Sequence, residues 1–123
     1  MAVKRILLVE DEPAIYDLLE LILRREGYVV EVATTAIEAK VLLDGPLYDL
    51  VICEWRLPDG NGTRIADAAA ALGSETVLMT DDLQMPGDKT GRHATLMKPL
   101  RPSEIVAHVE GRIGKARGVD RLR

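Results

Sequence analysis

Acidic side chains stand directly after two apolar runs of the sequence, in positions that could bind a hard cation. Glu10, Asp11 and Glu12 follow the first run, and Glu54 follows a later run that ends with the single cysteine, Cys53. Carboxylate oxygen is the ligand that Mg²⁺ prefers, and Mg²⁺ keeps several of its waters, so one or two protein carboxylates are enough. Open α/β sheets bind ligands at the carboxyl ends of their strands. If the two runs are parallel strands, these acids predict a cation site at that edge of the sheet.

Two more polar residues end later apolar runs: Thr80 follows residues 77–79, and Lys98 follows residues 95–97. Taken singly, such residues are common at strand ends, and carboxylates often only interact with a helix N-terminus. The informative feature is their order and spacing. An acid pair comes first, then Glu54 with Pro58 and Gly62 after it, then the threonine, then Lys-Pro. In this order the sequence resembles a response-regulator receiver domain of two-component signalling.

The resemblance implies an assignment of metal ligands. Receiver domains hold Mg²⁺ with an acid pair and with the residues around a phosphate-accepting aspartate. By resemblance, Asp11 would bind the metal directly and Glu10 would bind it through water. Glu54 would add a carboxylate oxygen, and Arg56 would add its main-chain carbonyl. Mg²⁺ is therefore the expected cofactor, bound weakly.

The resemblance also implies three phosphoryl-handling positions, and the sequence departs from the family pattern at one of them. Glu54 stands where the accepting aspartate is expected, while Thr80 and Lys98 stand where a switch hydroxyl and a lysine would contact phosphoryl oxygens. One extra methylene moves the nucleophilic oxygen, and phosphoryl transfer depends on positioning. Glu54 is therefore predicted to imitate the phosphorylated state, as a natural or an engineered variant. Asp81 and Thr95 replace a small residue and an aromatic that are common in the family, which also argues against ordinary signalling.

Apolar runs bounded by turn residues alternate with segments of helical period, which predicts an α/β fold. We expect a doubly wound five-stranded parallel sheet of the flavodoxin-like receiver type, as a single domain over residues 1–123 with a frayed tail from about 115. Between strands four and five, Pro86, Gly87 and Gly91 predict a fourth helix that is short or irregular, and a mobile surface that selects the partner. Strands are expected near 4–9, 28–33, 49–53, 75–80 and 94–97, and helices from Pro13 to Gly27, over 36–43 and 64–72, and after Pro102.

Composition limits the possible partners. Hydrophobic residues make up 47% of the chain and aromatic residues only 3%, so the core must be aliphatic. The formal net charge of −4 argues against direct binding to DNA, which depends on lysine and arginine. The expected partners are a sensor histidine kinase or phosphotransfer protein and an unknown downstream protein. With one cysteine and no long apolar span, we expect a cytoplasmic protein without membrane insertion.

The main expectation is therefore a non-enzymatic receiver that acts through protein contacts, and alternatives remain open at this stage. One is a metal-independent pseudo-receiver in which Lys98 holds Glu54. Another is a flavodoxin-like domain that binds a small molecule, although no phosphate-cradling loop follows the first strand. A third is an acidic Mg²⁺ phosphatase, which would need a second acid two residues after its nucleophile. His93 and His108 are expected at the surface or on a helix face, since no Cys/His spacing indicates zinc.

Overall fold

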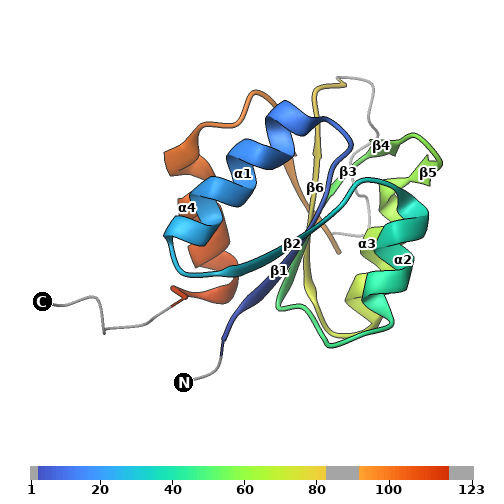
Figure 1. Cartoon of the computed structure of the whole chain (residues 1–123), viewed down its shortest axis with the longest axis horizontal. Helices are drawn as coiled ribbons and strands as arrows, with labels where there is room; N and C mark the ends of the chain where they lie inside the picture. Colours follow the sequence, from blue (N-terminus) through green and yellow to red (C-terminus); the bar gives the residue numbers. More distant parts are fainter. Residues whose placement is uncertain (1–2, 83–91, 117–123) are drawn as a thin grey trace, which may run out of the picture.

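The computed structural model describes residues 3–82 and 92–116, which form an α/β fold around one parallel sheet (Figure 1). The sheet has five strands in the order β2-β1-β3-β6-β7, and every neighbouring pair is parallel. This confirms the predicted doubly wound sheet, and each strand lies within a residue or so of its predicted bounds. The strands are β1 (Arg5–Val9), β2 (Val29–Ala33), β3 (Leu50–Glu54), β6 (Glu75–Thr80) and β7 (Ala94–Met97).

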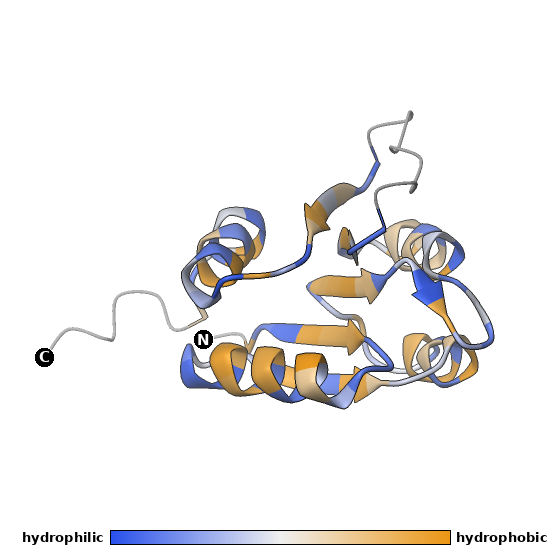
Figure 2. Ribbon diagram, turned by 90° about the horizontal axis from the view of Figure 1, so that it is seen from above, coloured by the Kyte–Doolittle hydropathy of each residue, from blue (hydrophilic) through white to orange (hydrophobic). Residues whose placement is uncertain are grey.

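The described residues include four helices, arranged in pairs on the two faces of the sheet (Figures 1 and 2). α1 (Pro13–Arg25) and α4 (Pro102–Ile113) cover one face, while α2 (Ala36–Leu43) and α3 (Gly62–Ala71) cover the other. α3 begins two residues before the predicted start, because the Asn61 side chain accepts a hydrogen bond from the Thr63 N–H at 2.7 Å and caps it there. No helix among these described residues is long and apolar enough to cross a membrane.

Two predictions fall largely outside the described residues. The expected short or irregular fourth helix, with its mobile surface, centres on residues 83–91, and most of the expected frayed tail lies in 117–123. The helix labelled α4 here is the one predicted after Pro102.

The core is aliphatic, as the composition predicted, and it lies on both faces of the central strands. Residues 6–9 of β1 and 50–53 of β3 are at most 1% exposed. Leu7 and Val51 belong to the cluster beneath α2 and α3, and Leu8 and Ile52 belong to the cluster beneath α1 and α4. Figure 2 shows these strands as mainly apolar, the pattern expected of a parallel sheet that is covered on both faces. The polar residues that follow β1 and β3 are therefore fixed by a rigid support.

A short antiparallel ribbon follows β3 and was not predicted. Its strands are β4 (Arg56–Leu57) and β5 (Gly60–Asn61). At the turn, the two carboxylate oxygens of Asp59 accept hydrogen bonds from the N–H groups of Ala36 and Ile37 at 2.7 and 3.0 Å. The ribbon therefore caps α2 and returns the chain to the end of β3, where α3 begins.

Glycine is required at the end of this return. A Cβ atom at position 62 would lie 2.0 Å from the Glu54 carbonyl oxygen and 2.9 Å from its carbonyl carbon. The Gly62 N–H also donates to the Trp55 carbonyl at 2.7 Å. The spacing between Glu54 and Gly62 in the sequence thus reflects a close backbone contact, which only glycine permits.

The prediction that His93 lies at the surface was wrong. Its side chain is 1% exposed and lies between β6 and α3. The ring contacts Thr76 Oγ1 through Nδ1 at 2.5 Å and Asp67 Oδ1 through Nε2 at 2.6 Å. These partners lie 17 and 26 positions away in the sequence, so no local pattern indicated them. Because both ring nitrogens have partners, burial of the polar ring is tolerated.

Candidate functional site

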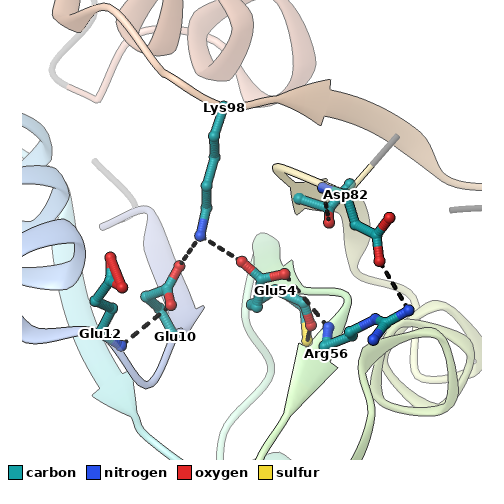
Figure 3. A network of polar contacts seen from close by, with 8 residues as sticks. Glu10, Glu12, Glu54, Arg56, Asp82 and Lys98 are labelled. Atoms are coloured by element: carbon teal, nitrogen blue, oxygen red, sulfur yellow. Dashed lines mark hydrogen bonds and ion pairs between the residues drawn. The ribbon is translucent and has the colours of Figure 1, made fainter. Parts of the chain in front are cut away.

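Three predicted site residues meet at the carboxyl edge of the sheet (Figure 3). Glu10 follows β1, Glu54 ends β3 and Lys98 follows β7. The Lys98 ammonium donates to Glu10 Oε1 at 2.7 Å and also to Glu54 Oε1. The three side chains are 1%, 8% and 11% exposed, respectively. One desolvated cation therefore bridges two desolvated carboxylates that come from different strands.

The remaining oxygen of each carboxylate is held by the backbone. The Glu12 N–H donates to Glu10 Oε2 at 3.1 Å, and the Arg56 N–H donates to Glu54 Oε2 at 3.3 Å. Each of the four carboxylate oxygens thus has a donor within the protein. The two buried carboxylates are therefore both paired and hydrogen-bonded, as buried charged groups must be.

Burial and ion pairing shift the pKa values of these side chains in opposite directions. Burial raises the pKa of Glu10, and the hydrogen bond from Lys98 opposes that rise only in part. At Lys98, burial lowers the pKa, but the hydrogen bonds with Glu10 and Glu54 outweigh it, so the pKa is raised overall. The ammonium form of Lys98 is therefore favoured by the folded structure.

Thr80 lies beside this cluster but uses its polar atoms on the loop that follows β6. The residue is 1% exposed, and its Oγ1 accepts a hydrogen bond from the Asp82 N–H at 3.0 Å. Its carbonyl accepts from the Lys98 N–H at 2.8 Å. The predicted switch hydroxyl is thus tied to the start of the segment that links β6 to β7.

The Arg56 side chain links two loops beside the cluster. Its Nη2 lies 2.7 Å from Asp82 Oδ2 (Figure 3). Its guanidinium lies 4.9 Å from the centroid of the Trp55 ring. This side chain is 69% exposed, so the ion pair contributes little to stability by itself. The contact joins the ribbon after β3 to the loop after β6, and the sequence pattern did not predict it.

The predicted magnesium ligands do not assemble into a site that fits Mg²⁺. Asp11, the expected direct ligand, is exposed, while Glu10 and Glu54 face the Lys98 ammonium. The Lys98 ammonium that these two carboxylates share would repel a divalent cation at such close range.

Comparison with known proteins identifies the family of this chain. The family model "Response regulator receiver domain" matches residues 6–110. The chain belongs to the response regulator receiver domain family. It is therefore a receiver domain of the kind found in two-component response regulators.

Relatives and solved structures give the same family and fold. The chain is 30% identical over 115 residues to the DNA-binding response regulator MtrA of Mycolicibacterium smegmatis, covering 89% of this chain and 50% of that protein. It is 32% identical over 114 residues to the regulatory protein VanR of Enterococcus faecium, covering 89% and 49%. The receiver thus spans about half the length of these relatives.

Among solved structures, a CheY-like receiver domain protein from Methanospirillum hungatei superimposes with a TM-score of 0.82 at 29% identity, covering 91% of this chain and 94% of that one. The receiver domain of the sensor histidine kinase PA1611 from Pseudomonas aeruginosa superimposes with a TM-score of 0.79 at 28% identity, covering 93% and 100%. That structure has a magnesium ion coordinated in its active site cleft. The receiver fold of this chain is therefore shared with proteins that bind Mg²⁺.

Proposed function

We propose that this receiver signals through protein contacts in a state that Glu54 sets without phosphorylation. The observation that supports the proposal is the contact between Glu54 Oε1 and the Lys98 ammonium. By family resemblance, this lysine contacts the phosphoryl group of an activated receiver. A carboxylate that reaches the lysine from the end of β3 therefore supplies the negative charge that a phosphoryl group would bring.

The same contact makes Glu54 a poor phosphate acceptor. A nucleophilic oxygen must approach the phosphorus in line with the leaving group. Both oxygens of Glu54 instead accept hydrogen bonds, from Lys98 and from the Arg56 N–H, and the residue is 6% exposed. Attack would have to start from an oxygen that is already hydrogen-bonded in a desolvated site and is displaced by one methylene from the usual position.

The partners that we propose are proteins. Sensor histidine kinases or phosphotransfer proteins are the general partners of receivers, and the downstream partner is a protein or an attached segment that reads the state of the site. MtrA is named as a DNA-binding regulator, but this chain covers only half of it. The net charge of −4 supports the view that this receiver does not itself contact DNA.

Intact-protein mass after incubation with acetyl phosphate and Mg²⁺, or with a cognate kinase, tests the proposal. We expect no phosphoryl adduct on the natural chain. The matched variant Glu54→Asp restores the family acceptor, and we expect it to gain an adduct that is lost on mild hydrolysis. An adduct that maps to Glu54 in the natural chain would overturn the proposal.

A further inference from the structure

We propose that the Lys98 ammonium is the resident cation of this site and replaces the divalent metal, so that removing Lys98 creates a divalent-cation site between Glu10 and Glu54. This inference deepens the proposed function and rests on it for the identity of the site. It rests on two observations: the hydrogen bonds that the oxygens of the two carboxylates accept, and the burial of all three side chains.

Every oxygen of the two carboxylates already accepts a hydrogen bond within the protein. Lys98 donates a hydrogen bond to one oxygen of each carboxylate, and the N–H groups of Glu12 and Arg56 donate to the other two oxygens. A metal ion that entered beside Lys98 would meet a positive charge and carboxylates that are already bonded. It could bind only by displacing the ammonium, because like charges at such close range repel.

Displacing the ammonium is unfavourable because the site is desolvated. Lys98 is 11% exposed, and the oxygens that it contacts belong to side chains that are 1% and 8% exposed. A buried charge that loses its partner is strongly destabilised. Mg²⁺ also gives up its own waters reluctantly, so it gains little from exchanging them for oxygens that another cation already holds.

Side-chain length explains why the lysine can serve both acids. Glu10 and Glu54 both carry the longer acidic side chain, and both reach Lys98 from neighbouring strands β1 and β3. The shorter acid, Asp11, lies exposed beside them. An aspartate at position 54 would hold its carboxylate closer to the end of β3, so Glu54→Asp should loosen the bridge to Lys98 and admit metal more readily.

The test is a Mg²⁺ titration without any phosphate donor, read by thermal melting and by Trp55 fluorescence. The natural chain should respond in neither measurement at millimolar Mg²⁺. Lys98→Met leaves both carboxylates without their cation, so its melting temperature should rise by roughly 5 °C once Mg²⁺ is about tenfold above its Kd. The control Lys98→Arg keeps a cation in place and should respond little.

A Mg²⁺-dependent rise in the melting temperature of the natural chain, as large as that of Lys98→Met, would overturn the inference. If Lys98→Met does not fold, the amide spectrum of the natural chain during a Mg²⁺ titration replaces this test. Shifts of the Glu12 and Arg56 N–H resonances would refute the inference. Unchanged resonances would support it. If the natural chain binds Mg²⁺ but forms no phosphoryl adduct, this inference fails and the proposed function stands. An adduct on Glu54 that forms equally well without Mg²⁺ would sink only the proposed function.

Discussion

At the scale of single residues, one buried lysine lies between two buried glutamates and sets the charge of the site. The sequence predicted that Glu10, Glu54 and Lys98 lie at one sheet edge, because each follows an apolar run. It could not predict which oxygen each donor takes, since that depends on side-chain length and on backbone N–H groups positioned by the fold. Asp11 illustrates the limit: its type and place suggested a direct metal ligand, yet it lies exposed outside the bridge.

The bridge makes stability depend on pH in the alkaline range. Because the pKa of Lys98 is raised above 10.5 in the folded state, its contribution is fully present below pH 10.5 and is lost as pH rises through the folded value. Lys98→Met should lose about 3–5 kcal/mol of unfolding free energy at neutral pH, since it leaves two carboxylates without their cation. The difference between the two proteins should shrink above pH 10.5.

Urea denaturation of both proteins from pH 8 to pH 11.5 measures this difference. Burial and its hydrogen bond to Glu31 raise the pKa of Tyr48 to about 12, so Tyr48 lowers the stability of both proteins at the alkaline end, and its effect cancels in their difference. A difference that stays constant across this range would show that the ammonium charge of Lys98 contributes nothing to stability.

At the scale of elements, the sheet and helices followed from apolar periodicity, whereas two local structures did not. The β4–β5 ribbon has only two residues in each strand, too short for an alternating pattern. The contacts of His93 join residues that are far apart in sequence. Both structures depend on tertiary contacts, which a single sequence does not display.

Gly62 tests the close return of the chain to β3. Gly62→Ala would place a methyl group 2.0 Å from the Glu54 carbonyl oxygen, so the backbone there must shift. We expect the free energy of unfolding to fall by at least about 1–3 kcal/mol. Gly111→Ala is the matched control: nothing lies within 4 Å of its added Cβ, so α4 should gain up to about 1 kcal/mol. Equal effects of the two substitutions in denaturant unfolding would contradict the proposed contact.

His93 tests the connection between α3 and the start of β7. His93→Leu removes one contact from Thr76 Oγ1 and one from Asp67 Oδ1, which then keep, within the part of the chain that the structure describes, only their contacts with Arg92, and it should cost about 1–3 kcal/mol. His108→Leu is the control, because His108 Nε2 is buried without a hydrogen-bond partner among the described residues and that bond is not there to lose. Comparable unfolding midpoints for the two variants would argue against a stabilising role for the His93 contacts.

At the scale of the whole molecule, the chain is a receiver in which a lysine of its own pairs with two acids at the carboxyl edge of the sheet. The order of the motifs along the sequence was enough to predict the family and the parallel sheet, because strand ends in this topology meet at one edge. The chemical state of that edge depends on the contact between Glu54 and Lys98, which only the folded arrangement reveals. We therefore propose that the resting form of this receiver already has the contact between a negative charge at position 54 and Lys98 that others reach on phosphorylation.

The most direct test of this claim is a comparison of amide spectra among the natural chain, Glu54→Asp, and Glu54→Asp after treatment with acetyl phosphate and Mg²⁺. We expect the Thr80, Asp82 and Lys98 amides of the natural chain to resonate near those of the phosphorylated variant. Resonances that coincide with those of the unphosphorylated variant would show that Glu54 does not imitate the phosphoryl group, and would contradict the account.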